Sequence, residues 1–383
     1  MHPFSLLIKP VSDGCNLHCR YCFYLNKTPY EHSEIHRMGK DVLEQLISTY
    51  LATPQPCHIF TWQGGEPTLM GYDFFLNVVE LQKKFGREGS MIANGVQTNA
   101  TLLDDKLCNL FRHYNFLIGC SLDGPAEVHD KYRTTAKGKP THSTVMQGID
   151  MMRRHGVNFN IMTLVSQANV HKASEIYRYF RDQGLVFHQY IPCVEFDEKG
   201  KLQPFAINGE EWGDFLCRIF DEWYPDDVYT ISIRHFDTII SKLANDEIQS
   251  CTIGKECRNY LVVEYNGDIY PCDFFVRKEL CLGNIMRSGW EKALSSSLFQ
   301  GFASRKSQWS RACVECEYLE LCGGDCTRNR TWAADLKIPH SILCVGWKYF
   351  YNTTRIHFAR IADQLKARAH SGGSIATSHS IEF

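Results

Sequence analysis

Short apolar runs rich in β-branched and aromatic residues alternate with amphipathic stretches through the first half of the chain. The apolar runs predict strands at residues 4–9, 58–62, 91–97, 116–121, 158–164 and 187–191, and the amphipathic stretches predict helices near 40–52, 72–85, 104–113, 144–154 and 171–183. Strands that alternate with helices predict a parallel sheet built from right-handed crossovers. Six such strands are too few for a closed eight-stranded barrel. We therefore predict an α/β fold with an open, partial (βα)6 barrel of the TIM type.

The pattern changes beyond about residue 195. Helical spacing recurs at 209–223 and 231–245, and a long helical pattern covers 345–369. Between them, Asn266-Gly267 joins two alternating runs, which predicts a hairpin because both turn residues tolerate positive φ. We divide the chain into a barrel at 1–195, a helical connector at 196–250, a cysteine-rich extension at 251–350, and a terminal helix with a disordered tail at 351–383.

Charge and composition argue against several kinds of partner. A formal net charge of −2 gives no electrostatic reason to expect nucleic acid or an anionic membrane, and no run reaches the ~18 apolar residues of a spanning helix. The first residues are too short an apolar stretch for a secretory signal, so we expect a cytoplasmic protein. Seventeen cysteines stand out against this background. Because cytosolic thiols stay reduced, such cysteines are more often metal ligands or catalytic groups than disulfides.

Cys15, Cys19 and Cys22 follow the first predicted strand with the spacing CxxxCxxC. Zinc usually takes four ligands, and no fourth Cys or His follows at a suitable spacing; His18, between two of the cysteines, is interpreted as an exposed loop residue. A [4Fe–4S] cluster on three cysteines keeps one iron open, whereas electron-transfer clusters normally use four. With the βα pattern around it, the motif resembles the radical S-adenosylmethionine (SAM) enzymes, in which the last x is typically aromatic, as Tyr21 is here.

The resemblance extends to residues that would hold SAM. Residues 64–67 read Gly-Gly-Glu-Pro and are similar to the GGEP motif of these enzymes, although such a turn alone is more often a tight strand-to-helix connection. The resemblance implies that the Gly65 backbone and Glu66 bind the SAM amino group. It places Ser121 at the ribose or methionine portion, Arg133 at the carboxylate as a bidentate partner, and Val194 near the adenine. An isolated Arg or Ser is usually a surface or capping group.

Eight further cysteines lie between residues 251 and 344. Their spacing is also compatible with a pair of zinc ribbons. The Cx2Cx5Cx3C run and the Gly between Cys257 and Cys272 resemble the SPASM extension, which carries two auxiliary [4Fe–4S] clusters and brings the expected total to three [4Fe–4S] clusters. The resemblance assigns Cys251, Cys257, Cys272 and Cys326 to the first auxiliary cluster, and Cys313, Cys316, Cys322 and Cys344 to the second. The remaining cysteines are interpreted mostly as small core residues: Cys57, Cys108, Cys120, Cys193, Cys217 and Cys281.

Asp273 directly follows Cys272 and is flanked by aromatic residues. It is either a buried carboxylate poised as a proton acceptor or an Asp that satisfies backbone N–H groups in a turn. Motifs between residues 4 and 350 look like the anaerobic sulfatase-maturating enzymes, among them CNLxCxYCFY at 15–24, QGGEPT at 63–68 and YPCDF at 270–274. One departure is Ala100, where the related motif commonly has Gly; if that position needs positive φ, Ala is locally strained.

This second resemblance implies a reaction. The family oxidises a Cys or Ser in an unfolded sulfatase segment, with the pattern Cys/Ser-x-Pro/Ala-x-Arg, to Cα-formylglycine. A 5′-deoxyadenosyl radical made from SAM would take the substrate Cβ hydrogen, Asp273 would accept the thiol or hydroxyl proton, and an auxiliary cluster would take the second electron. A low-potential donor such as flavodoxin or ferredoxin would supply the first electron.

Two other functions compete with this interpretation. A SPASM enzyme that crosslinks a ribosomally made peptide often carries an extra peptide-binding domain, and no region ahead of the first predicted strand could house one here. A non-catalytic zinc or iron–sulfur assembly module would explain neither the barrel pattern nor the Gly-Gly-Glu-Pro turn. Formylglycine formation is the leading hypothesis.

Overall fold

The computed structural model describes residues 2–25, 30, 35–331 and 340–370, and the chain separates into two units. The first unit comprises 1–122, 130–160 and 257–304, and the second comprises 123–129, 161–256 and 305–383. The predicted disorder of the tail concerns residues 371–383, which lie outside the described residues. Among the described residues, no helix combines the length and the apolar character needed to cross a membrane.

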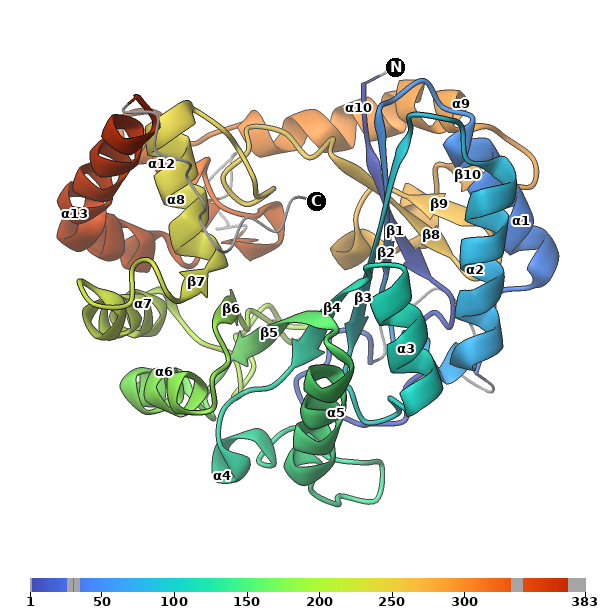
Figure 1. Ribbon diagram of the computed structural model, residues 1–383. Helices are drawn as coiled ribbons and strands as arrows, with labels where there is room; N and C mark the ends of the chain where they lie inside the picture. The colour runs from blue at the N-terminus through green and yellow to red at the C-terminus, as the bar shows by residue number, and fades with distance from the viewer. Residues whose placement is uncertain (1, 26–29, 31–34, 332–339, 371–383) are drawn as a thin grey trace. The chain divides into compact units, whose positions relative to one another are not determined.

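Four parallel strands form the centre of the first unit. They are β1 (Ser5–Lys9), β2 (Cys57–Trp62), β3 (Met91–Thr98) and β4 (Leu117–Ser121), paired in chain order. Buried positions alternate along β1 and β2, as expected for strands with one face against the core. Their connecting helices include α1 (Lys40–Leu51), α2 (Gly71–Phe85), α3 (Asp105–His113) and α5 (His142–His155). Figure 1 shows α1, α2 and α3 along one side of these strands.

A hairpin from the cysteine-rich region completes the sheet of the first unit. Strand β8 (Tyr260–Glu264) pairs in parallel with β1, and β9 (Asp268–Tyr270) pairs antiparallel with β8. Gly267 has a φ of +86°, which confirms the predicted hairpin turn. Strand β10 (Gly283–Asn284) pairs with β9, and the short helices α9 (Trp290–Ser295) and α10 (Ser297–Ser304) follow. The parallel pairing of β8 with β1 is the feature that the sequence did not predict.

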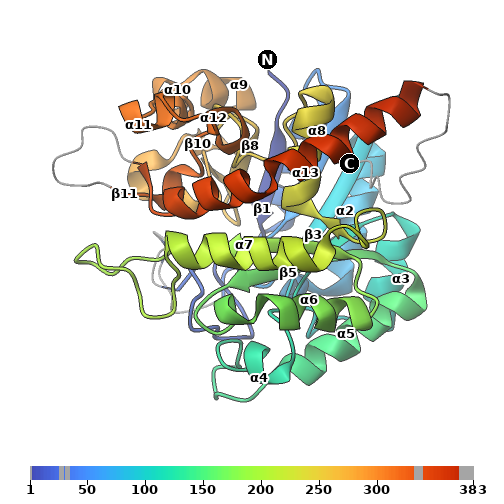
Figure 2. The ribbon, with the colours of Figure 1, turned by 90° about the vertical axis from the view of Figure 1, so that its left-hand side faces the viewer.

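Helices dominate the second unit. Its parallel strands β5 (Asn158–Val165, from Ile161 on), β6 (Phe187–Pro192) and β7 (Ser232–Ile233) are paired in that order. Its helices are α4 (Ala126–His129), α6 (Ala173–Asp182), α7 (Gly209–Trp223), α8 (Arg234–Asn245), α11 (Arg311–Val314), α12 (Leu319–Cys322) and α13 (Cys344–His370), and β11 (Arg330–Thr331) pairs with β12 (His340–Ser341). Figure 2 shows α13 alongside α7. The contact is close, since a Cβ on Gly346 would lie 1.9 Å from the carbonyl oxygen of Gly209.

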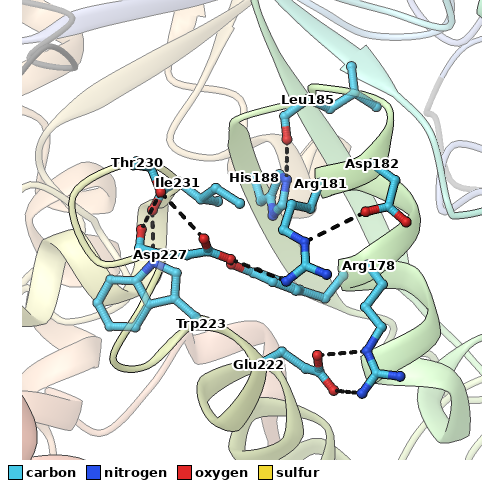
Figure 3. A network of polar contacts seen from close by, with 11 residues as sticks. Arg178, Arg181, Asp182, Leu185, His188, Glu222, Trp223, Asp227, Thr230 and Ile231 are labelled. Carbon is cyan, nitrogen blue, oxygen red and sulfur yellow. Dashed lines mark hydrogen bonds and ion pairs between the residues drawn. The ribbon is translucent and has the colours of Figure 1, made fainter.

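Polar contacts tie α6 to α7 and to the loop after it (Figure 3). Arg178 donates two hydrogen bonds to the carboxylate of Glu222, at 2.8 and 2.5 Å. Asp227 accepts a hydrogen bond from Tyr177 Oη at 2.7 Å and pairs with Arg181. Because Arg178 is largely exposed, we attribute most of the stability of this region to the buried apolar faces of the helices rather than to the ion pairs.

The predicted elements match the structure closely, with one difference. The six strands and the helices of the first half are present near the predicted bounds. The helix predicted from residue 231 begins instead at Arg234, because Ser232 and Ile233 pair with β6 as strand β7. The local periodicity of the sequence cannot predict this pairing, because the partner strand β6 lies more than 40 residues away in the chain.

Candidate active site

The loop that carries Cys15, Cys19 and Cys22 follows β1 and is fixed by backbone hydrogen bonds. On one side, the amides of His18 and Arg20 donate to the carbonyls of Thr134 and Tyr132, at 2.8 and 3.0 Å. Within the loop, Cys22 N donates to Cys19 O at 3.0 Å. His18 is exposed, in agreement with its interpretation as an ordinary loop residue.

The three thiols lie close enough to affect one another. The pKa of Cys15 is raised to about 12. Burial is the largest cause, the charge of Glu66 is the next, and Cys19 and Cys22 add smaller contributions in the same direction. Burial also raises the pKa of Cys22, which the positive charge of Arg133 partly offsets. Neighbouring buried thiolates repel one another, and a bound cationic iron–sulfur core relieves that repulsion. The three side chains therefore fit a cluster.

The Gly-Gly-Glu-Pro turn packs directly on the cysteine loop. Glu66 N donates to Gly14 O at 2.8 Å. Gly65 has a φ of +45°, and a Cβ at this position would lie 2.0 Å from the carbonyl oxygen of Gly14. Only glycine permits both this backbone conformation and this close approach. The turn is therefore more specific than a generic strand-to-helix connection.

Glu66 is buried, and its carboxylate organises the turn. Its Oε1 accepts hydrogen bonds from Thr68 N, Thr68 Oγ1 and Thr98 Oγ1, at 3.0, 2.5 and 2.7 Å, and its Oε2 accepts from Asn99 N at 2.7 Å. Oε1 thus carries three of the four donors, whereas Oε2 has one donor and a carboxylate oxygen commonly takes two. Oε2 therefore keeps one position for an external donor.

The structure places three of the other expected SAM residues in the same unit as the cysteine loop. The guanidinium of Arg133 lies over the ring of buried Tyr21, 5.6 Å from its centroid. Ser121 ends β4 and accepts a hydrogen bond from Gln97 at 3.1 Å. Val194 is buried in the second unit. The structure therefore places Arg133 against Tyr21, and it pairs Ser121 with Gln97 of the neighbouring strand.

Asp273 lies at the edge of the sheet where the carboxyl ends of β1 and β2 meet. It follows Cys272 in a short 3-10 turn, Asp273–Phe275, after the hairpin, and it is 7% exposed. Lys9 and Glu264 are register partners at the ends of β1 and β8, and Gln63 follows β2. The pairing of β8 with β1 thus carries Asp273 to the cysteine loop and the barrel strands.

The two oxygens of Asp273 have different environments. Oδ2 accepts a hydrogen bond from Tyr24 Oη at 2.5 Å and a longer one from Gln63 Nε2 at 3.4 Å. Oδ1 lies 3.7 Å from Lys9 Nζ, beyond hydrogen-bond distance, and has no hydrogen-bond donor among the described residues. A buried carboxylate oxygen without a donor is unusual in a folded protein. Oδ1 is therefore able to accept a proton or hydrogen bond from a bound molecule.

Lys9 and Glu264 form a buried ion pair beside this carboxylate, with Nζ and Oε1 2.7 Å apart. Burial alone would lower the pKa of Lys9, but the charges of Glu264 and Asp273 raise it above its usual value. Burial raises the pKa of Asp273, against the lowering influence of Lys9 and Tyr24. Burial and the charge of Asp273 raise the pKa of Tyr24, so the phenol stays protonated and donates its hydrogen bond. The donors to its carboxylate are side chains, and no backbone N–H of the described residues bonds to it, which argues against the turn interpretation of Asp273.

The second group of cysteines is partly assembled within the second unit. Burial, Asp325 and then the charges of Cys344 and Cys313 raise the pKa of Cys322 to about 12, and Cys313 and Cys316 act in the same direction on Cys344. Among the described residues, no group of three or more His, Cys, Asp or Glu side chains has the arrangement that holds a single metal ion. Four of the six remaining cysteines are buried, as core residues should be.

Sequence reasoning missed four residues around Asp273: Lys9, Tyr24, Gln63 and Glu264. A signal was present for two of them. Lys9 and Glu264 each end an apolar run that the structure buries as a strand. A charge at the end of a buried strand needs a partner, and each of these two charges is the partner of the other.

Comparison with known families assigns the chain to a class of enzyme. Residues 10–180 match the model of the radical SAM superfamily, and residues 251–317 match that of an iron–sulfur cluster-binding domain of the SPASM type. The chain is therefore a radical SAM protein with a SPASM domain, which binds iron–sulfur clusters and S-adenosylmethionine.

Individual relatives make the assignment narrower. The chain is 37% identical to a serine-type anaerobic sulfatase-maturating enzyme of Bacteroides thetaiotaomicron, over 95% of this chain and 91% of the relative. It is 33% identical to a cysteine-type enzyme of Clostridium perfringens, over 96% and 100%. The chain belongs to the anaerobic sulfatase-maturating enzymes.

Solved structures agree with this family. The chain superimposes on native anSMEcpe with bound AdoMet and Cp18Cys peptide with a TM-score of 0.89 and 32% identity, covering 95% of this chain and 100% of that one. This match confirms the predicted partial-barrel fold with its C-terminal SPASM extension. Streptococcus suis SuiB matches with a TM-score of 0.60 at 16% identity, over 85% and 73%, which shows a shared fold only.

Proposed function

We propose that this chain oxidises a Cys or Ser in a sulfatase segment of the pattern Cys/Ser-x-Pro/Ala-x-Arg to Cα-formylglycine, with Asp273 as the proton acceptor. The observation that carries this role is the carboxylate oxygen Oδ1 of Asp273, which is buried and has no hydrogen-bond donor among the described residues. A general base must lie within hydrogen-bond reach of the proton it takes, and an oxygen without a donor has its acceptor positions open for that proton.

Three [4Fe–4S] clusters fit the cysteine pattern. We assign the SAM-binding cluster to Cys15, Cys19 and Cys22, and the second auxiliary cluster to Cys313, Cys316, Cys322 and Cys344. The ligands of the first auxiliary cluster, Cys251, Cys257, Cys272 and Cys326, come from both units, so their assignment rests on the sequence spacing. When bound, SAM and the clusters supply the radical that removes the Cβ hydrogen and the acceptor for the second electron.

The chain's own residues bind and orient the reactants. Gly65 and the free position on Glu66 Oε2 suit the SAM amino group, and Arg133 suits its carboxylate. Tyr21 packs under Arg133 and holds its guanidinium in place. Ser121 and Val194 are proposed to contact the remainder of SAM. Tyr24 and Gln63 hold Oδ2 of Asp273, so that Oδ1 stays available to the thiol or hydroxyl proton of the substrate.

The remaining assignments follow from the sequence. We propose a low-potential donor such as flavodoxin or ferredoxin, an unfolded sulfatase polypeptide as substrate, and a cytoplasmic location. We keep the division at residues 195, 250 and 350 as a description of the barrel, connector, SPASM and terminal parts.

A peptide assay tests the function. Reduced, cluster-loaded enzyme is incubated anaerobically with SAM and a Cys-x-Pro-x-Arg peptide, or its Ser counterpart, because the relatives include both types. We expect an aldehyde and 5′-deoxyadenosine, and absence of aldehyde from both peptides would refute the proposal. Asp273→Asn should still cleave SAM and form little aldehyde. Asp41→Asn, a matched change at an exposed residue in the first turn of α1, should leave both products unchanged.

A further inference from the structure

Asn99 is a buried asparagine directly after β3, in the same unit as the cysteine loop. Its side-chain Oδ1 accepts hydrogen bonds from Thr101 N and Thr101 Oγ1, at 3.0 and 2.6 Å. Its side-chain Nδ2 donates to Asn16 Oδ1 at 2.9 Å and to Cys15 Sγ at 3.7 Å. Every donor and acceptor position of this amide is therefore used, and one of its N–H groups faces a sulfur of the cysteine loop.

The backbone fixes which end of the Asn99 amide faces the sulfur. Thr101 N is a main-chain N–H group and can only donate, so the atom that it contacts has to be the amide oxygen. The amide nitrogen then lies on the side of Cys15 and Asn16. Thr101 Oγ1 also accepts a hydrogen bond from Asn16 Nδ2 at 2.9 Å, which holds the Asn16 oxygen toward Asn99. The network thus directs an N–H group at Cys15.

A turn alone does not account for an asparagine at this position. The bond from Thr101 N to Asn99 Oδ1 closes an Asx turn, which aspartate makes equally well and serine makes with its hydroxyl. Only the two N–H groups distinguish asparagine from these residues. One of them points at the sulfur of Cys15, and the other engages the Asn16 oxygen, which lies 3.9 Å from the same sulfur. The feature that is specific to asparagine therefore acts at Cys15.

A hydrogen bond to the sulfur of a cluster ligand favours the reduced state of the cluster. Reduction adds one negative charge, and an N–H donor interacts more strongly with a more negative sulfur, which is why such bonds help to set the potential. Cys15 Sγ accepts one hydrogen bond from within the loop, from Leu17 N at 3.4 Å. Asn99 adds a donor that belongs to the end of β3, so its position does not depend on the conformation of the loop.

We propose that Asn99 is a positioning residue that raises the reduction potential of the SAM-binding cluster through its N–H···S hydrogen bond to Cys15. The inference rests on the assignment of Cys15, Cys19 and Cys22 under the proposed function. The step that it assists is the transfer of one electron from the external low-potential donor, in which the amide proton stays on Asn99. The backbone N–H of Asn99 donates to Glu66 Oε2 at 2.7 Å, so one residue contacts both a cluster ligand and a side chain proposed to hold SAM.

The test measures a reduction potential without any peptide. The loaded enzyme is titrated anaerobically and followed by EPR, and the signal of the SAM-binding cluster is the one missing from a protein with Cys15, Cys19 and Cys22 replaced by Ala. Asn99→Ser keeps an acceptor for Thr101 N but has no donor that reaches Cys15. We expect it to lower the equilibrium constant for reduction of this cluster about fivefold, which is about 40 mV for one electron, and to leave the other signals unchanged. Asn99→Asp should lower it further, because it also adds a negative charge.

A matched control is Asn94→Ser, in the same strand β3. Asn94 is also buried, and its amide bonds to Gln82 and Trp62 rather than to a sulfur. It should leave the potential unchanged even where it lowers the thermal midpoint. The proposal is refuted if Asn99→Ser retains the potential of the unmodified enzyme. It is also refuted if Asn94→Ser lowers the potential by the same amount, since loosening of the fold would then be the cause.

A measurement on the unmodified enzyme covers the case in which an Asn99 variant does not retain the cluster. Asparagine with an isotopic nitrogen label only in its side-chain amide is incorporated, and the reduced SAM-binding cluster is examined by ENDOR spectroscopy. We expect a hyperfine coupling to the Asn99 amide nitrogen through the N–H···S bond, and its absence refutes the proposal. Asn16 Nδ2 carries the same label but donates to Thr101, so it should give no comparable coupling. None of these outcomes depends on aldehyde formation, so a failure of the peptide oxidation is distinguishable from a failure of this inference.

Discussion

Neutralising Glu264 should impair the proton acceptor without touching it. Lys9 Nζ lies 2.7 Å from Glu264 and 3.7 Å from Asp273 Oδ1, so the ammonium is held mainly by Glu264. The Glu264→Gln variant lacks the ion pair with Lys9, and we expect the Lys9 ammonium to move toward Asp273 Oδ1. The oxygen proposed to receive the substrate proton then acquires a permanent cationic partner.

The distances give the size of the effect. With an effective dielectric constant of about 20, the two pairs are worth about 6 and about 4.5 kcal/mol of Coulomb energy, a difference of about 1.5 kcal/mol. Because about 1.4 kcal/mol corresponds to a factor of ten, we expect aldehyde formation to fall about tenfold. Breaking a buried pair costs at most about 3–5 kcal/mol of folding stability, and less here because Asp273 remains.

The assay compares aldehyde with 5′-deoxyadenosine in the same reaction, together with the thermal unfolding midpoint of the loaded enzyme. Glu44→Gln is the matched control, since Glu44 also pairs with a lysine, Lys84, at 2.7 Å but with both side chains about half exposed. It should change stability by less than about 1 kcal/mol and leave both products unchanged. If Glu264→Gln gives the same ratio of aldehyde to 5′-deoxyadenosine as the unmodified enzyme, the ion pair does not control Asp273.

Three further outcomes follow from the structure. Gly65→Ala should abolish SAM binding in equilibrium dialysis, because its Cβ would lie 2.0 Å from Gly14 O, and unchanged affinity would contradict the close packing. Ala100→Gly should raise the free energy of unfolding by up to about 1 kcal/mol, because Ala100 has a φ of +58°; a lower free energy of unfolding in a denaturant titration would show that the packing of the methyl group outweighs the strain. Burial lowers the pKa of His188 to about 4, so the folded state favours the neutral ring. Its contribution is complete above the unfolded pKa of about 6.5 and is lost as the pH falls toward 4, by about 1.4 kcal/mol per pH unit. The thermal midpoint of the unmodified chain should therefore fall between pH 7 and pH 5.5 by more than that of His188→Asn. An equal fall of the midpoint in both proteins would refute this.

Local pattern was sufficient for the elements and for the cysteine motifs. Apolar runs and periodicity located β1 through β6 and the long helix α13, because strands such as β2 bury alternate positions and β4 buries a continuous apolar run. It could not reveal that β8 pairs with β1, since parallel pairing between distant segments leaves no local trace. The partners of Asp273 were missed for the same reason: Lys9, Tyr24 and Gln63 come from segments more than 200 residues away in the chain. Ala100, which stands where the related motif commonly has Gly, has a positive φ of +58°, so the sequence pattern identified the position that favours glycine.

The pairing of β1 with β8 also constrains how the protein is made. Lys9 and Glu264 are 255 residues apart in the sequence, and they are register partners in the sheet. At a synthesis rate of about 5–20 residues per second, β1 emerges roughly 13–50 s before the strand that covers its open edge. During that interval the edge of β1 and the buried charge of Lys9 lack their final partners. The surroundings of Asp273, the proposed proton acceptor, are thus assembled only after most of the chain has been synthesised, so a chain that ends before β8 cannot complete them.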